Sequence, residues 1–92
     1  MLELKQTSQF KKDLHRMARR GANMGLLDEV IQLLRRNEPL PAKYADHPLT
    51  GNWAGYRDCH IQPDWLLVYR TDSKALILTA TRTGTHSELF KR

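Results

Sequence analysis

The chain has 92 residues, 40% of them hydrophobic, and a formal net charge of +5 at pH 7. This length predicts a single domain over residues 1–92, and the hydrophobic fraction excludes a disordered chain. The longest apolar run, WLLVY at 65–69, excludes a membrane-spanning helix, because such a helix needs about 20 apolar residues. We therefore expect no membrane association.

The N-terminus and the cysteine content both bear on the cellular compartment. Glu3 and Lys5 interrupt the stretch MLELKQTSQF, which lacks the apolar core of a signal peptide. Cys59 is the single cysteine and has no partner for an internal disulfide, which fits a reducing compartment. We expect a cytoplasmic protein.

The positive charge is concentrated at the two ends of the chain. Residues 1–22 hold six Lys or Arg against two acids, and residues 82–92 hold three against one. Such a distribution suggests a polyanionic partner, with nucleic acid as the first candidate. A soluble basic domain with a solvated face explains the charge equally well.

The N-terminal half predicts a strand followed by two helices. Residues 2–7 alternate apolar and polar side chains, and Thr7 or Ser8 can then cap a helix. The apolar side chains of this helix share one face, and a basic stripe of Lys12, Arg16, Arg19 and Arg20 runs beside it. A second apolar helical face spans residues 26–34, and a short turn makes the two helices antiparallel.

The C-terminal half predicts three strands and a short helix. Residues 39–53 are rich in proline and irregular, which in so small a domain is typical of a functional loop. GYRDCHI, WLLVYR and ALILTATR then form antiparallel strands, of which the second is apolar on both faces and hence central. Thr85 and Glu88 have capping-box spacing, so a helix is expected to begin at His86.

This order of elements predicts the α+β class. We expect the N-terminal strand and the two antiparallel helices to pack on one face of a mainly antiparallel four-stranded sheet, with a short C-terminal helix. The other face of the sheet would stay open for a partner or a substrate.

Metal binding and thiol catalysis are both disfavoured by spacing. No pair among the four histidines and Cys59 has the separation of zinc-finger or helical ligands. Cys59 and His60 are neighbours on a strand and point to opposite faces, which also makes a poor Cys/His dyad. We expect no metal and no other cofactor, and we interpret Cys59 as a small core residue.

General acid–base chemistry fits the polar residues better. Strand and loop ends are expected to bring together His47, His60, Asp64, Arg82 and His86. An imidazole exchanges protons near neutral pH, and RNA cleavage through the 2′-hydroxyl needs a base, an acid and a positive charge at the phosphate. Taken singly, each of these residues is better explained by a surface or structural role, and it is their expected clustering at one end of the sheet that favours a site.

Two long motifs carry a family resemblance. DHPLTGNWAGYRDCHIQPDWLLVYR and RTGTHSELF closely resemble the YafQ toxins, a branch of the RelE-like bacterial toxins, and the likeness extends along nearly the whole chain. The resemblance implies a RelE-like fold and a bacterial endoribonuclease toxin that cleaves translated mRNA on the ribosome without a metal. It also implies a cognate antitoxin that neutralises the toxin, with operator DNA bound only through that antitoxin.

The resemblance also implies roles for individual residues. His86 would donate the proton to the leaving oxygen, His60 or Asp64 would act as the base or orient it, His47 would assist, and Arg82 would hold the scissile phosphate. Trp65 and Phe90 would position or stack on bases, whereas the residues alone also allow Trp53, Trp65 and Phe90 to be core residues. The residues expected to face ribosomal RNA are Lys12, Arg16, Arg19, Arg20 and Lys91, with Arg92.

A non-enzymatic interpretation competes with this one. The same scaffold could bind nucleic acid or another target through its basic face, in which case the histidines would be dispensable. A transcription regulator acting alone is a weaker alternative, because no helix-turn-helix pattern is present in the sequence.

Overall fold

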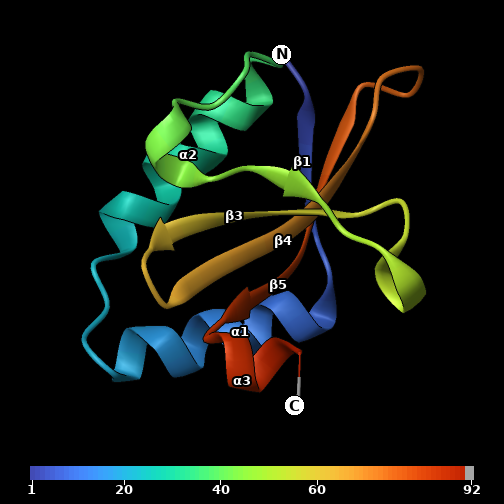
Figure 1. Cartoon of the computed structure of the whole chain (residues 1–92). Coiled ribbons are helices and arrows are strands. Elements are labelled where there is room, and N and C mark those ends of the chain that lie inside the picture. Colours follow the sequence, from blue (N-terminus) through green and yellow to red (C-terminus); the bar gives the residue numbers. More distant parts are fainter. Residues whose placement is uncertain (91–92) are drawn as a thin grey trace.

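A computed structural model describes residues 1–90 of the chain. Figure 1 shows its elements, which in chain order are β1 (Glu3–Gln6), α1 (Ser8–Arg19), α2 (Met24–Arg35), η1 (Ala42–Tyr44), β2 (His47–Pro48), η2 (Gly51–Trp53), β3 (Arg57–Gln62), β4 (Trp65–Asp72), β5 (Ile77–Gly84) and α3 (His86–Leu89). The predicted α+β class and the order of the main elements are confirmed. Among residues 1–90, no helix has the length and apolar character needed to cross a membrane.

The sheet has five strands in the order β1-β5-β4-β3-β2. β1 runs parallel to β5, and the other neighbours are antiparallel. The predicted count of four strands is therefore wrong by one, because β2 joins the edge of the sheet. This strand has only two residues, His47 opposite Asp58 and Pro48 opposite Arg57, and so short a pairing leaves no periodic pattern in the sequence.

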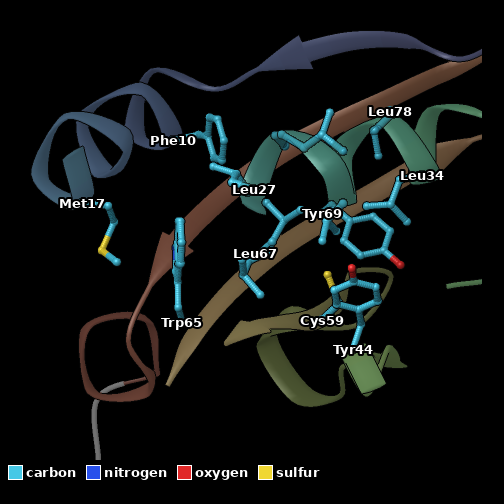
Figure 2. Packing of buried hydrophobic residues seen from close by; sticks show 14 of the residues in the cluster. Phe10, Met17, Leu27, Leu34, Tyr44, Cys59, Trp65, Leu67, Tyr69 and Leu78 are labelled. Atoms are coloured by element: carbon cyan, nitrogen blue, oxygen red, sulfur yellow. The ribbon is translucent and has the colours of Figure 1, made fainter. Parts of the chain in front are cut away.

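One face of the sheet is covered by α1 and α2. Figure 2 shows the core that forms there, a cluster that includes Phe10 and Met17 from α1, Leu27 from α2 and Leu67 from β4. Phe10 is 1% exposed, and removing such a ring from a core costs about 3–5 kcal/mol. The predicted apolar face of the first helix is thus confirmed as a packing face.

The opposite face of the sheet carries a smaller apolar cluster. Leu66 and Val68 point to this side of β4, where Leu89 of α3 packs on them. Partly buried residues of the 49–56 segment and Phe90 extend the cluster. The face that we expected to be open is therefore partly covered, and the covering segments form the walls of a pocket.

Side-chain caps begin both α1 and α3. Thr7 accepts a hydrogen bond from the backbone N–H of Phe10 at 2.9 Å and donates one to the carbonyl of Thr81 at 2.8 Å. At the start of α3, the predicted capping box of Thr85 and Glu88 is present. This cap places His86 in the first turn of α3, directly after β5.

Candidate active site

A pocket of about 620 Å³ opens where β2, β3 and α3 meet. β2 supplies His47, β3 supplies His60, and the first residue of α3 supplies His86. The complete lining is His47, Leu49, Thr50, Trp53, Asp58, His60, His86, Ser87 and Phe90. The predicted convergence of three histidines from distant parts of the sequence is therefore present in the structure.

The alternation of β3 decides which of its side chains reach this pocket. Asp58 and His60 line it, whereas Cys59 and Ile61 point into the core between the sheet and the helices. Cys59 is 0% exposed, and burial raises the pKa of its thiol far above the usual range. The interpretation of Cys59 as a core residue agrees with this position, since a thiol held protonated is a poor nucleophile.

Asp64, in the turn between β3 and β4, holds His86 in place. One carboxylate oxygen, Oδ1, lies 2.8 Å from the ring Nδ1 and accepts the backbone N–H of His86 at 3.1 Å. The hydrogen bond from the His86 ring is the main reason why the pKa of Asp64 falls below its usual range. Because the carboxylate engages Nδ1, proton exchange with a ligand is left to Nε2.

His60 is the pocket imidazole whose ring nitrogens form no hydrogen bond within residues 1–90. Its ring stands edge-on to that of His86, with centroids 5.4 Å apart and planes at 68°. Within the described chain, no side chain or backbone group hydrogen-bonds to its ring nitrogens, and the ring is half-buried. An imidazole with both nitrogens free can accept a proton from a bound ligand.

His47 is fixed on both sides of its ring. Nδ1 lies 2.8 Å from the carbonyl oxygen of Ala45, and Nε2 lies 3.1 Å from Oδ1 of Asp58. The backbone before it is anchored too, because Asp46 accepts hydrogen bonds from Tyr69 and Arg57. The side chain of His47 is nevertheless half exposed where it lines the pocket.

Aromatic rings close another wall of the pocket. Phe90 meets Trp53 edge to face, with centroids 6.0 Å apart, and Trp53 meets Tyr56 in the same way at 5.3 Å. The pocket thus combines three imidazoles and a buried carboxylate with aromatic surface. Unpaired nucleotides need such surface, because bases stack on aromatic rings.

Comparison with known proteins identifies the family to which the chain belongs. The family model described as a bacterial toxin of type II toxin-antitoxin system, YafQ, matches residues 2–91. The chain belongs to the YafQ family. A curated relative, the mRNA interferase toxin YafQ of Escherichia coli strain K12, is 44% identical over 89 residues, covering 96% of this chain and 95% of the relative.

Solved structures of YafQ-like toxins share the fold. YafQ in a crystal structure of the E. coli DinJ-YafQ complex superposes with a TM-score of 0.89 at 42% identity, covering 98% of this chain and 99% of that one. A metal-bound toxin from Helicobacter pylori superposes with a TM-score of 0.92 at 41% identity, covering 98% and 100%. In this YafQ-family chain, the described residues include no group of three or more His, Cys, Asp or Glu side chains placed to hold a metal ion.

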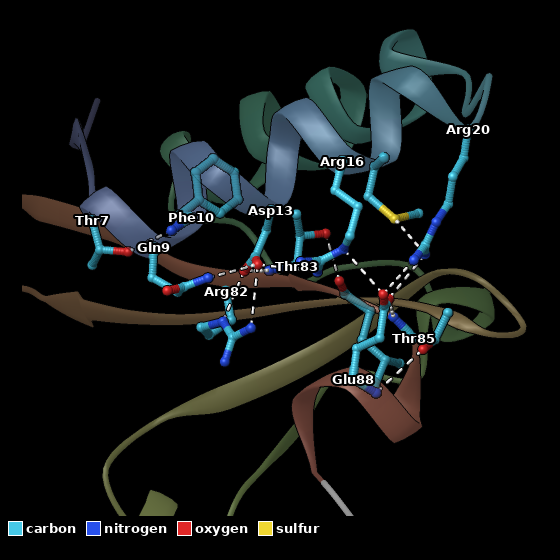
Figure 3. A network of polar contacts seen from close by, with 12 residues as sticks. Thr7, Gln9, Phe10, Asp13, Arg16, Arg20, Arg82, Thr83, Thr85 and Glu88 are labelled. Carbon is cyan, nitrogen blue, oxygen red and sulfur yellow. Dashed lines mark hydrogen bonds and ion pairs between the residues drawn. The ribbon is translucent and has the colours of Figure 1, made fainter.

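Arg82 lies beside the pocket but does not line it. Figure 3 shows its guanidinium bound by Asp13 of α1, with Nε 2.8 Å from Oδ2 and Nη2 3.2 Å from Oδ1. Asp13 is 0% exposed and also accepts hydrogen bonds from Arg16, Gln9 and the backbone N–H of Thr83. Burial tends to raise the pKa of Asp13, but these hydrogen bonds outweigh it and leave the pKa below its usual range.

Trp65 is in the core, contrary to its predicted role in base stacking. Its side chain is 3% exposed, and Figure 2 shows it on the same side of the sheet as Met17. The indole N–H donates to Oγ1 of Thr83 at 2.8 Å, and that hydroxyl donates to the carbonyl of Leu66 at 2.7 Å. A ring buried and bonded in this way ties β4 to β5 and presents no face to RNA.

The basic stripe of α1 is partly neutralised by α3. Glu88 lies 3.0 Å from Nε of Arg16 and accepts hydrogen bonds from Arg20 (Figure 3). Lys12 and Arg19 are exposed and form no ion pair within residues 1–90. Lys91, also predicted to face RNA, lies outside the described residues, as does Arg92.

Five lining residues were not among the predicted site residues, namely Leu49, Thr50, Trp53, Asp58 and Ser87. Trp53 stands in the GNW segment of the first motif, so the motif was the signal that could have identified it. Asp58 is two residues before His60 and therefore lies on the same face of the strand. This spacing placed Asp58 next to the site but did not indicate that it is buried. Its carboxylate is 4% exposed, a property that depends on the packing of β2 against β3.

Proposed function

We propose that this chain is a ribosome-dependent endoribonuclease toxin of a type II toxin–antitoxin system, cleaving translated mRNA in the bacterial cytoplasm. The observation that carries the proposal is the pair of histidines in one pocket. Nδ1 of His86 is hydrogen-bonded to Asp64. The ring of His60 has its centroid 5.4 Å from that of His86, and among the described residues neither of its nitrogens is hydrogen-bonded. One proton donor beside one proton acceptor is what 2′-hydroxyl attack requires.

The reaction runs as an internal transfer at phosphorus. His60 removes the proton of the 2′-hydroxyl, and the 2′-oxygen forms a bond to the phosphorus. The bond from phosphorus to the 5′-oxygen breaks, and His86 delivers the proton of Nε2 to that oxygen. The products are a 2′,3′-cyclic phosphate and a 5′-hydroxyl, with the proton balance restored when His60 returns its proton to solvent and His86 regains one.

Positive charge and aromatic surface hold the RNA. His47 lines the pocket, and Arg82 uses Nε and Nη2 for Asp13 but within residues 1–90 forms no hydrogen bond through Nη1, which is left for a phosphate. Phe90 and Trp53 offer the rings on which flanking bases stack. Exposed Lys12 and Arg19 supply charge toward ribosomal RNA.

The proposed mechanism is metal-free. A base, an acid and a positive charge are all present as side chains, so each step has a protein group that performs it. The metal-bound H. pylori relative makes a direct test worthwhile. Cleavage is expected to continue in a chelator that removes transition metals but spares the Mg²⁺ that ribosomes need, and loss of cleavage that returns with added Zn²⁺ or Cu²⁺ would contradict the mechanism.

A cognate antitoxin is the proposed protein partner. A relative has been crystallised as the E. coli DinJ-YafQ toxin-antitoxin complex, and 97% of this chain superposes on a chain of that structure. We expect the antitoxin to neutralise cleavage and to supply the contact with operator DNA. Co-expression with the antitoxin encoded beside the toxin should restore growth.

The function is tested by cleavage of a short mRNA on programmed ribosomes, compared with the same mRNA free in solution. The parent protein should produce new 5′ ends only on the ribosome, and His86→Ala should lower the rate by about 10²–10⁴-fold, the usual contribution of a general acid. His15→Ala is the matched control, because His15 is exposed on α1 and outside the pocket. Equal cleavage by His86→Ala, or equal cleavage of free mRNA, would contradict the proposal.

A further inference from the structure

Asp58 is a buried acid with an unsatisfied oxygen at the wall of the pocket. The residue is 4% exposed, and within residues 1–90 its Oδ1 is buried without a hydrogen-bond partner. Buried carboxylates are normally paired, because an isolated charge in a low dielectric is costly. Since Oδ1 is buried, it does not contact a ligand in the pocket directly, and the group at contact distance from it is a neighbouring side chain.

The neighbouring side chain is the ring of His47. A carbonyl oxygen can only accept, so the 2.8 Å contact with Ala45 requires a proton on Nδ1 of His47. The other nitrogen, Nε2, then faces Oδ1 of Asp58 at 3.1 Å, close enough for an ion pair but not aligned as a hydrogen bond. If Nε2 carried no proton, its lone pair and the carboxylate would repel each other at this distance.

We propose that Asp58 is a positioning residue that holds His47 as an imidazolium, with a proton on both ring nitrogens, so that His47 presents fixed positive charge to the pocket. Asp58 supplies the negative charge and the Ala45 carbonyl supplies the orientation. The exposed half of the ring lets water solvate the positive charge, while within residues 1–90 the carboxylate of Asp58 accepts no hydrogen bond.

The contributions at Asp58 oppose one another, since burial, the largest, disfavours its ionised form while three histidines favour it. His47 on β2, His60 on β3 and His86 on α3 favour its ionised form, and Asp46, before β2, opposes it. Burial outweighs them and leaves the pKa of Asp58 above its usual range. A carboxyl in this state is stabilised by a cation at contact distance, and His47 is the imidazole at that distance.

The consequence for catalysis rests on the proposed function. A ring held as an imidazolium has no free lone pair, so His47 cannot remove the 2′-hydroxyl proton, and that role falls to His60. His47 instead stabilises the negative charge that develops on the phosphate oxygens in the transition state. Asp58 acts in the reaction through His47, the imidazole at contact distance.

The first test reads the protonation of His47 directly, without RNA. Long-range ¹H–¹⁵N spectra of the full chain in metal-free buffer at pH 7 should show both ring nitrogens of His47 protonated. In Asp58→Asn, which keeps the shape of the side chain, the amide can donate to Nε2, so the neutral ring with only Nδ1 protonated is expected. Asp28→Asn, at an exposed position of α2, makes the same charge change and should leave His47 as in the parent.

The second test asks whether Asp58 acts through His47 in cleavage. Asp58→Asn should lower the cleavage rate at least about tenfold in the parent and have little further effect in a His47→Gln background, because coupled residues are not additive. An unprotonated Nε2 in the parent, or equal effects of Asp58→Asn in both backgrounds, would overturn the inference. If the parent cleaves no mRNA, the proposed function fails, and the spectra still decide the state of His47.

Discussion

Oδ1 of Asp64 is hydrogen-bonded twice to His86, to the ring Nδ1 at 2.8 Å and to the backbone N–H at 3.1 Å. The turn between β3 and β4 therefore fixes both the first residue of α3 and the orientation of the imidazole that it carries. Strong orientation of a proton donor by a carboxylate is a general device for fixing its tautomer.

Asp64→Asn should lower mRNA cleavage by about 10–100-fold, the usual cost of losing the group that orients an imidazole. The amide still accepts from His86 but no longer stabilises a positive charge on it. The cleavage rates of the variant and the parent are compared as pH–rate profiles. A profile identical to that of the parent, measured beside the charge-matched Asp28→Asn, would remove Asp64 from the mechanism.

Glu88 should make folding stability depend on pH in acid. Hydrogen bonds from Arg20 are the main cause that lowers the pKa of this carboxyl from 4.5 to about 2. A depressed pKa means that the stabilisation is complete above about pH 4.5 and is lost as the pH falls toward 2. Because the ion pairs are partly exposed, we expect the loss to be about 1 kcal/mol.

Glu88→Gln isolates this effect, because glutamine preserves the capping box with Thr85 while removing the charge that binds Arg16 and Arg20. Urea unfolding between pH 2 and 5 should show a shallower loss of stability for Glu88→Gln than for the parent. Parallel pH dependences of the two proteins would show that the ion pairs contribute nothing measurable.

Trp65 and Phe90 should respond oppositely to substitution. Trp65→Phe loses the hydrogen bond to Thr83 and should lower the free energy of unfolding by about 1 kcal/mol, with cleavage by the folded protein unchanged. Phe90→Ala should reduce cleavage on the ribosome through a higher KM, because it removes aromatic surface from the pocket. A Trp65→Phe protein that is stable but binds mRNA weakly would restore the stacking role predicted from the sequence.

Asp13 should be the most costly of the acids to remove. Asp13→Ala leaves Arg82 and the backbone N–H of Thr83 without their shared acceptor, and breaking a buried pair costs about 3–5 kcal/mol. Glu3→Ala, at an exposed position of β1, is the control. Calorimetry or urea unfolding gives the difference, and a loss below about 1 kcal/mol would mean that Arg82 finds another partner.

Local patterns in the sequence predicted the structural features that depend on residues close together in the chain, such as strand faces and helix caps. The alternation of Trp65, Leu67 and Tyr69 marks the core face of β4, and it could have warned that Trp65 points inward. The Thr85 and Glu88 spacing predicted the cap that begins α3. In the same way, strand alternation placed His60 toward the site.

The remaining features depend on contacts between residues far apart in the chain. Asp13 and Arg82 are separated by 69 positions, and Arg20 and Glu88 by 68. No periodicity in the sequence indicates which charged side chains meet across such distances. The basic stripe of α1 was therefore predicted to be available for RNA, although Arg16 and Arg20 form ion pairs with Glu88. The short β2 strand, which buries Asp58, was unpredictable for the same reason.

The burial of Cys59 gives the protein an internal reporter of unfolding. As the single cysteine, with 0% of its surface exposed and the pKa of its thiol raised by burial, it should resist alkylation in the native state. Labelling by a thiol reagent then proceeds only as fast as the core between β3 and the helices opens. The stability of each variant can thus be followed from the mass gained at one atom, in the same samples used for cleavage.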